Sequence, residues 1–375
     1  MKFSVSSKAL YNAASAVSKV INSKNALTIL DNFLIELHGN VLSITGSDSE
    51  NALTARVEVN EPKGDGALCI KARRLVELLK ELPDQGVEVD INDDTLEMQI
   101  SYTSGHYSFV GQRADQYPTF EPEAAGESVT FEVATEQIIA GLDNTMFAVS
   151  DDEYRVIMQG VLLDITEDAL TFVATDTRKL VRYIDRRTAP GVTGSCVIPS
   201  KPANILKNVF AKDSTLRFTM NARNAVIEND VMTFQCTFLN GRYPDYNRVI
   251  PRSNTNVLTV DRTALLNAVR RVGIFVEVDG GLEKFRITPE AILIKSNDPN
   301  LCTSAREQLP CSYSGTELTI GFNAGYMVEI LNTIKSTDVI VNLGDASRPG
   351  IFKPSEENDN TELLMLLMPM TVGDF

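Results

Sequence analysis

Three regularly spaced aspartates are the residues best suited to chemistry in this chain. Asp48, Asp176 and Asp298 each follow a short apolar segment, with a leucine or isoleucine six positions earlier. Carboxylates gathered in one site can hold the two metal ions of a phosphoryl-transfer enzyme, so a carboxylate-dependent nuclease is one hypothesis. The intervals of 128 and 122 residues place each aspartate in a different domain, however. We therefore expect each to form a turn by bonding its own backbone.

Other candidates for catalysis are few. His38 and His106, the two histidines, have no serine, cysteine or aspartate at a recognisable triad spacing. The run Asp151-Asp152-Glu153 is typical of a surface loop, and no glycine-rich phosphate-binding motif occurs. The five cysteines have no C-x-x-C spacing, so we expect buried, reduced thiols and neither a disulfide nor a zinc site (Cys69, Cys196, Cys236, Cys302, Cys311). The chain is predicted to be no enzyme and to carry no metal or cofactor.

The aspartates mark a threefold repeat. An isoleucine lies 22 residues after each of them, at Ile70, Ile198 and Ile320. The aspartates and the isoleucines therefore recur at the same intervals along the chain. A fixed period of this kind indicates repeated structural units. One third of 375 residues is long enough to bury an ordinary core. The sequence therefore predicts three similar domains, over residues 1–122, 128–250 and 256–375.

Each third contains two amphipathic segments and several alternating ones. Apolar residues at steps of three and four predict helices over 6–21, 71–82, 135–149, 200–212, 261–274 and 322–335. Thr135 and Asp261 are predicted N-caps. Alternation predicts strands such as 87–91, 96–100, 216–218 and 339–343, with linkers at 117–128 and 243–257 and an exposed hairpin or loop at 353–361. The predicted fold class is α+β, with helices on one side of antiparallel sheets.

The charge is distributed unevenly between helices and the remainder. The chain carries a net charge of −15, which normally argues against a nucleic-acid partner. The six predicted helices carry +7 in total, however, which leaves −22 for all other residues. One interpretation is that these are ordinary solvated helix faces. The other is that equivalent helices form a common basic surface for a polyanion, which is bound through its phosphates without sequence specificity.

The composition is typical of a soluble globular protein. Hydrophobic residues make up 43% of the chain and charged residues 23%, and no apolar run approaches the length of a membrane span. The first residues lack the apolar core of a secretory signal. A cytoplasmic protein without a membrane partner is therefore expected.

A set of short motifs, in order along the whole chain, resembles one family. The motifs are the initial MKF, residues 27–32 (LTILDN), 174–180 (ATDTRKL), 240–246 (NGRYPDY), 321–323 (GFN) with Tyr326, and 367–370 (LMPM). With the length and the repeat, they are similar to the bacterial β sliding clamps, the processivity subunits of DNA polymerase III. The resemblance implies a ring-shaped, head-to-tail homodimer that encircles duplex DNA without sequence specificity and tethers polymerases to it.

The resemblance also implies a cleft for short peptides between the second and third domains. Such peptides come from DNA polymerase III and other polymerases, the clamp loader, and repair and initiation factors. The matching residues here are Met158, Thr175, Thr177, Arg178, Lys179, Leu180, Pro244, Arg248, Val249, Asn323, Tyr326, Leu366, Met368, Pro369 and Met370. Methionines suit an adaptable apolar floor, and Arg178, Lys179 and Arg248 could hold polar groups at its rim.

Two departures from the family pattern affect this cleft. The family commonly has Gly-His-Arg where this chain has Thr177-Arg178-Lys179, and the chain ends in Gly373-Asp374-Phe375 where a basic residue and leucine are common. Both are expected to change how tightly the cleft binds peptides and which peptide motif it prefers.

Two further surfaces complete the hypothesis. Residues expected to face DNA are Lys24, Arg73, Lys80, Lys201, Lys207 and Arg270. The subunit contact would pair Tyr107 and Phe109 of one copy with Ile274 and Phe275 of the other, in a heterologous interface. The alternatives are a repeat-built protein–protein scaffold that does not encircle DNA, the nuclease, and a ring closed by three copies.

Overall fold

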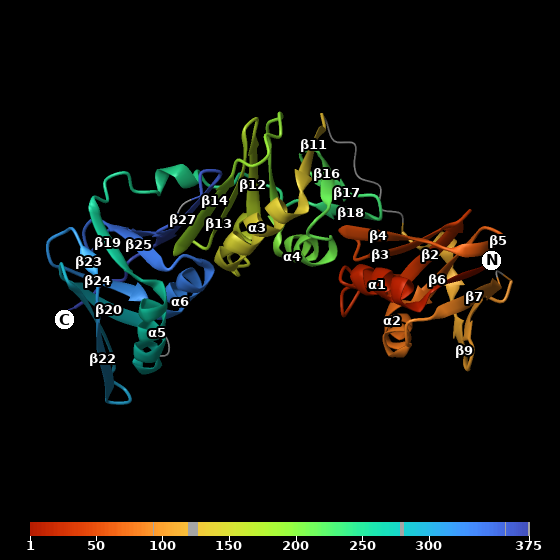
Figure 1. Ribbon diagram of the computed structural model, residues 1–375, viewed down its shortest axis with the longest axis horizontal. Coiled ribbons are helices and arrows are strands. Elements are labelled where there is room, and N and C mark those ends of the chain that lie inside the picture. Colours follow the sequence, from red (N-terminus) through yellow and green to blue (C-terminus); the bar gives the residue numbers. More distant parts are fainter. Residues whose placement is uncertain (93, 119–126, 278–280, 357, 374–375) are drawn as a thin grey trace. The chain divides into compact units, whose positions relative to one another are not determined.

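The computed structural model describes residues 1–92, 94–118, 127–277, 281–356 and 358–373 (Figure 1). The described residues form six α-helices, two in each third, as the periodicity predicts: α1 (Ser7–Ser18), α2 (Ala72–Glu81), α3 (Thr135–Thr145), α4 (Ser200–Val209), α5 (Arg262–Val272) and α6 (Ala324–Thr333). Short 3-10 turns are η1 (Thr28–Asp31), η2 (Ala114–Gln116), η3 (Met146–Ala148), η4 (Val156–Met158), η5 (Tyr246–Arg248) and η6 (Gly273–Phe275). The ranges predicted for α3 (135–149) and α5 (261–274) were too long, because each of these helices is followed directly by a 3-10 turn, η3 or η6.

The chain divides into two compact units. The first unit comprises Met1–Ile138 with Lys201–Phe238, and the second comprises Ile139–Ser200 with Leu239–Phe375. The division falls within the middle third, at α3 and at the start of α4. The predicted end of the first domain, residue 122, lies outside the described residues, as does most of the predicted linker 117–128.

The first unit contains two antiparallel sheets. One has the order β5 (Asn60–Lys63), β1 (Lys2–Ser6), β7 (Gly86–Asn92), β8 (Glu97–Tyr102), β9 (Gly105–Val110). The other has nine strands in the order β10 (Gln112–Arg113), β6 (Gly66–Lys71), β2 (Asn32–His38), β3 (Val41–Ser47), β4 (Asn51–Glu58), β18 (Met232–Thr237), β17 (Asn224–Glu228), β16 (Thr215–Met220), β11 (Val129–Ala134). The pairing of β4 with β18 joins the first third to the middle third.

The second unit is built in the same way. Its nine-stranded sheet has the order β15 (Gly194–Pro199), β12 (Gly160–Thr166), β13 (Ala169–Thr175), β14 (Lys179–Asp185), β27 (Thr361–Leu367), β26 (Gly350–Pro354), β25 (Asp338–Leu343), β19 (Asn256–Asp261), β23 (Ser312–Tyr313). Its smaller sheet has the order β22 (Thr303–Pro310), β21 (Ala291–Asp298), β20 (Leu282–Ile287), β24 (Leu318–Asn323). The pairing of β14 with β27 joins the middle third to the last third. The predicted hairpin at 353–361 connects β26 to β27, and its residue 357 lies outside the described residues.

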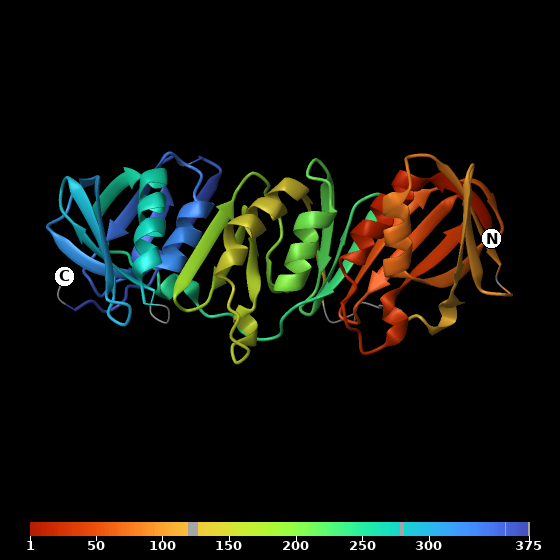
Figure 2. The ribbon, with the colours of Figure 1, turned by 90° about the horizontal axis from the view of Figure 1, so that it is seen from below.

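Within each unit the helices cover one face of the strands. Figure 2 shows α1 and α2, in red and orange, in front of the sheets of the first unit, and α5 and α6, in cyan and blue, in front of those of the second. α1 lies against β3 so closely that a Cβ on Gly46 would be 2.8 Å from Cγ1 of Val17. Burial of a residue such as Val17 contributes roughly 1.5–3 kcal/mol, so the apolar faces of the helices hold these layers together. The α+β prediction is confirmed.

The predicted caps and linkers can be compared with local structure. The Asp261 carboxylate accepts a hydrogen bond from the Ala264 amide at 2.6 Å, which confirms it as the N-cap of α5. Thr135 is the first residue of α3, and its hydroxyl lies 2.7 Å from that of Ser214. Most residues of the segment 243–257 are exposed, as expected for a linker, but Tyr243, Tyr246 and Ile250 pack on an apolar cluster of the second unit. None of the described helices is long and apolar enough to cross a membrane.

Candidate functional site

The three repeated aspartates each close a turn, as predicted. Oδ1 of Asp48 accepts hydrogen bonds from the amides of the residues two and three positions later, at 3.0 and 2.7 Å. Asp176 accepts the equivalent pair at 2.8 Å each, and Asp298 at 2.8 and 3.1 Å. A carboxylate that accepts two backbone amides stabilises the turn that leads from one strand to the next. No group of three or more potential metal ligands occurs within the described residues.

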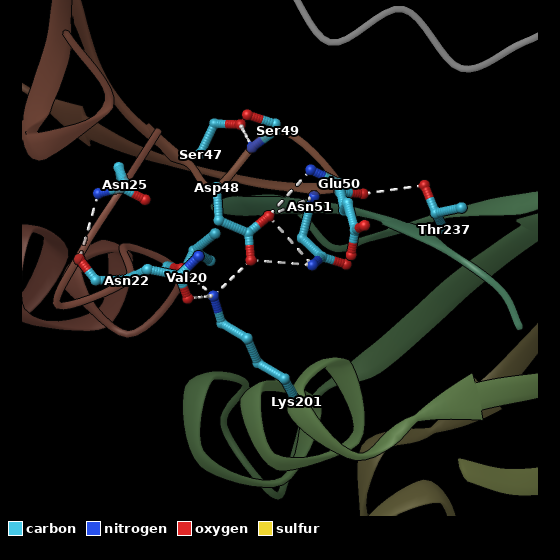
Figure 3. A network of polar contacts seen from close by, with 10 residues as sticks. All are labelled: Val20, Asn22, Asn25, Ser47, Asp48, Ser49, Glu50, Asn51, Lys201 and Thr237. Carbon is cyan, nitrogen blue, oxygen red and sulfur yellow. Dashed lines mark hydrogen bonds and ion pairs between the residues drawn. The ribbon is translucent and has the colours of Figure 1, made fainter. Parts of the chain in front are cut away.

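The Asp48 turn holds a lysine from the middle third, within the first unit (Figure 3). The Lys201 ammonium, on α4, forms an ion pair with Oδ2 of Asp48 and donates to the Val20 carbonyl and, at 2.7 Å, to Oδ1 of Asn22. Asn51, whose side-chain amide donates to both oxygens of Asp48, fixes the carboxylate. An ammonium has three protons to donate, and all three have protein acceptors here. Lys201 was predicted to face DNA; in the structure its ammonium joins α4 to the Asp48 turn.

The Asp176 turn holds a lysine of its own. Nζ of Lys179 lies 2.6 Å from Oε2 of Glu329 on α6 and 3.4 Å from Oδ2 of Asp176. It also lies 4.2 Å from the centroid of the Tyr326 ring, a cation–π distance. Lys179 is only 5% exposed. Its predicted position at the rim is therefore wrong, because its charge is buried and compensated between β14 and α6.

An apolar cluster spans the β14–β27 junction beside this turn. Its buried members come from both the middle and the last third (Leu162, Val173, Leu180, Val197, Ile351, Leu364, Leu366), and Ile157, Leu239, Tyr243, Tyr246 and Ile250 pack against it. Leu180 and Leu366, two predicted cleft residues, are opposite each other in the register of β14 and β27. The segment 243–250 also brings Pro244, Arg248 and Val249 to this region, since its aromatic residues rest on the cluster.

The chain end after β27 connects the same turn to the smaller sheet. The Met368 amide donates to the Arg178 carbonyl, and the Met370 amide donates to the Gly321 carbonyl, each at 2.8 Å. Pro369 lies between them, and Met368 is 39% exposed. On the other side, the Asn323 side chain caps α6 by accepting from the Tyr326 amide. The elements that meet around the Asp176 turn thus carry the predicted residues Met368, Pro369, Met370, Asn323 and Tyr326. Thr175, at the start of the turn, and the half-buried Met158 lie on them as well.

The exposed predicted residues around the cluster have few internal partners. Arg248 is paired with Asp245 at 2.9 Å but remains exposed, as are Arg178 and Val249. Thr177 is exposed and has φ of +75°, and its hydroxyl accepts a hydrogen bond from Arg155 at 2.8 Å. Arg155 and the tyrosines at 243 and 246 were missed from the sequence. The two tyrosines are three residues apart, and no alternation in 243–248 indicates that they pack on the cluster.

The other predicted DNA-facing residues lie on helices or an adjoining loop. Lys24 follows α1, Arg73 and Lys80 lie on α2, and Arg270 lies on α5, and all four are exposed. Arg73 is paired with Glu77 at 2.8 Å, and Arg270 donates to Oδ1 of Asn332. Lys207 on α4 is half-buried.

The predicted subunit-contact residues lie on two sheet edges or beside them. Tyr107 and Phe109 belong to β9, which pairs only with β8 among the described residues. Together with Leu78 of α2 they line an open cleft that also contains the charged residues Lys71, Arg74 and Glu77. Ile274 and Phe275 belong to η6, which packs against β22. Ile274 is 77% exposed, which is unusual for a large apolar side chain.

The cysteines are free thiols. Cys69, Cys196 and Cys236 are buried as expected, and burial raises the pKa of Cys69 and Cys236 to about 12. Cys302 is exposed, so the expectation of burial was wrong for this residue, which lies in the turn between β21 and β22.

Comparison with known proteins gives one consistent result. Three family models match consecutive parts of the chain: the N-terminal domain of the DNA polymerase III beta subunit over residues 1–121, the central domain over 132–245 and the C-terminal domain over 247–370. The beta sliding clamp of Pseudomonas aeruginosa is 26% identical over 372 residues, covering 99% of this chain and 100% of that protein.

Solved structures agree with the sequence comparison. A crystal structure of the Pseudomonas aeruginosa DNA polymerase sliding clamp with ligand has a TM-score of 0.92 at 25% identity, covering 99% of this chain and 100% of that one. A structure of the sliding clamp of Bartonella birtlesii bound to griselimycin has a TM-score of 0.91 at 26% identity, with the same coverage.

Proposed function

This chain belongs to the DNA polymerase III beta subunit family, and we propose on that premise that it is a sliding clamp for DNA replication. Two copies would form a ring that encircles duplex DNA and tethers polymerases to it without chemistry of its own. The three domains would cover residues 1–122, 128–250 and 256–375, and the protein would act in the cytoplasm.

The observation that carries this proposal is a cyclic pattern of strand pairing. β4 follows the Asp48 turn and pairs with β18, and β14 follows the Asp176 turn and pairs with β27. β22 follows the Asp298 turn in the same way, and β9 corresponds in position to β18 and β27. Among the described residues, however, β22 and β9 each have a partner on one side only. A second copy would supply the missing partner, with β22 of one chain beside β9 of the other.

Apolar groups beside these edges support the same contact. Ile274 and Phe275 lie next to β22, and the cleft beside β9 is lined by Leu78, Tyr107 and Phe109. An exposed isoleucine on one copy thus has an apolar counterpart on the other. Because the two patches differ, the interface is heterologous, and it remains finite only if the ring closes.

Cations on the helices and in the loop after α1 are suited to loose contact with DNA, and all of those proposed are exposed except Lys207, which is half-buried. We propose Lys24, Arg73, Lys80, Lys207 and Arg270 for this surface. Contacts from such side chains to phosphates carry no sequence information and weaken as salt rises. The excess of negative charge on the rest of the chain would disfavour DNA elsewhere.

Partner peptides would bind on the apolar cluster beside the Asp176 turn. The proposed set keeps Met158, Thr175, Thr177, Arg178, Leu180, Pro244, Arg248, Val249, Asn323, Tyr326, Leu366, Met368, Pro369 and Met370, with Lys179 as a buried support. The polymerases, loader, and repair and initiation factors named for the family are its expected partners.

Retention on DNA of different topology tests the function. With a clamp loader and ATP supplied, we expect the protein to remain on closed circular DNA and to be lost rapidly after the circle is cut. Retention should persist at a salt concentration that removes proteins bound only by charge, because a ring is held by topology. Equal loss from circular and linear DNA would instead favour a scaffold that does not encircle DNA.

A further inference from the structure

Glu283 is a buried carboxyl group. It lies on β20 and is 0% exposed, and neither of its carboxyl oxygens has a hydrogen-bond partner among the described residues. A buried carboxylate without compensation is very unfavourable, so the neutral acid is the stable form in this position. Burial raises the pKa of Glu283 to about 8 accordingly. Glu283 shares one face of β20 with Phe285 and Ile287, a period-two signal that was visible in the sequence.

The carboxyl group lies directly against the segment that carries Ile274 and Phe275. A Cβ on Gly273 would be 3.4 Å from Oε1 of Glu283. Gly273 is both the C-cap of α5 and the first residue of η6. The C-terminal end of a helix carries partial negative charge, which further disfavours a carboxylate at this point.

Nearby charged groups on the described elements are engaged elsewhere. On α5, Arg271 forms two hydrogen bonds to Glu307, and Arg270 donates to Asn332. On β21, Asp298 caps its own turn, and beyond η6 Glu277 accepts from Asn300. Lys284 precedes the buried Phe285 on β20 and is opposite Lys295 in the β20–β21 register, so both lysines lie on the other face of the sheet. On the packed side, Ser296 donates to the Val272 carbonyl, and Phe322 is opposite Glu283 in β24.

We propose that Glu283 makes the subunit contact sensitive to pH: the neutral acid lets η6 pack on the sheet, and ionisation displaces η6 and weakens closure of the ring. The proposal rests on the proposed function, because it takes η6 as part of the interface. The displaced state exposes the carboxylate to water, where its charge is solvated.

The direction of the effect follows from proton linkage. The packed state holds the proton more tightly than the displaced state, in which the glutamate titrates near its ordinary pKa. As pH rises between these two pKa values, the displaced fraction increases by up to about tenfold per pH unit. The increase stops above the pKa of the packed state, because both states are then ionised.

The dimer dissociation constant, measured by subunit exchange from about pH 6 to about pH 9.5, tests the proposal. For the unmodified protein we expect the constant to rise with pH and to level off above about pH 8. Glu283→Gln cannot ionise and should show no rise. Glu290→Gln, an exposed residue in the same β20–β21 hairpin, removes one charge as well and should behave like the unmodified protein.

The other outcomes are decisive in different ways. Identical pH profiles for the unmodified protein and Glu283→Gln would overturn the role of Glu283 while leaving the dimer intact. A monomer at every pH would overturn the subunit contact itself, and with it the ring. If Glu283→Gln does not fold, infrared spectroscopy of the unmodified dimer gives a second measurement: a protonated-carboxyl band that is present near pH 6 and lost through about pH 8 supports the proposal, and its absence near pH 6 overturns it.

Discussion

Lys179 is almost as buried as the leucine that follows it, yet its ammonium is compensated by two carboxylates and an aromatic ring. Removing one partner of a buried ion pair leaves the charge of the other uncompensated. When Lys179 is removed, the cost is limited, because the remaining Glu329 carboxylate is 43% exposed and can be solvated. Lys179→Met should therefore lower the free energy of unfolding of the second unit by about 2 kcal/mol. Denaturant unfolding followed by a probe in the second unit measures this.

The adjacent residue provides a matched control. Arg178 is exposed, so Arg178→Met should change stability by no more than about 0.5 kcal/mol. Glu329→Gln combined with Lys179→Met should cost less than the two single changes together, because both remove the same contact. Equal effects of Lys179→Met and Arg178→Met would contradict the assignment of Lys179 as a buried support.

Individual residues were predicted from the sequence with uneven success, for a physical reason. The aspartates could be assigned to turns because their hydrogen bonds are local, to amides two and three residues away. Lys179 and Lys201 could not be placed, because their shortest ion pairs are to Glu329 and Asp48, which are 150 and 153 residues distant, and residue type alone does not reveal burial. The burial of Glu283 was not predicted, because charged side chains were expected to be exposed.

The aspartate turns are alike in hydrogen bonding but not in backbone conformation. The residue after the aspartate has φ of +82° at Ser49 and +75° at Thr177, a left-handed conformation that costs a β-branched residue about 1 kcal/mol or more. The third turn has Pro299 in this place, whose ring restricts φ to about −65°.

Glycine should therefore have opposite effects in two of these turns. Thr177→Gly should raise the free energy of unfolding by about 0.5–1 kcal/mol, since relief of strain exceeds the loss of the Arg155 hydrogen bond. Pro299→Gly should lower it by about 0.5–1 kcal/mol, because the unfolded chain gains freedom. Thermal or denaturant unfolding checks both, and effects of the same sign would show that backbone conformation does not control these turns.

The helices and many strands were predictable because their signals are periodic and local. The pairing between strands was not predictable, since it depends on residues far apart in the sequence: among the described residues β4 and β14 pair with β18 and β27, whereas β22 has a partner on one side only. The same limit applies to the predicted cleft. Its residues were identified by resemblance, whereas the packing of Tyr243 and Tyr246 on the apolar cluster depends on contacts that no local pattern encodes.

In the proposed assembly, ring closure and peptide binding depend on separate parts of each chain. The closing edges are β9 and β22 with η6, whereas the apolar cluster and the Lys179 contacts lie within the second unit of a single chain. Loss of closure should therefore leave the peptide site intact. The opposite would hold for a site built by two copies, in which both functions would fail together.

Ile274→Asp separates these possibilities. A charge in place of the exposed isoleucine would have to be desolvated on contact with Leu78, Tyr107 and Phe109 of the other copy, so the dimer should dissociate. Light scattering should then give a mass near 41.2 kDa per particle and not twice that value, and retention on circular DNA should be lost. Affinity for a clamp-binding peptide of a polymerase should be unchanged, at one peptide per chain.

Val231→Asp, in the exposed turn between β17 and β18, is the matched control and should stay dimeric. A dimeric Ile274→Asp variant would show that η6 lies outside the subunit contact, and a mass near three chains for the unmodified protein would favour a ring of three.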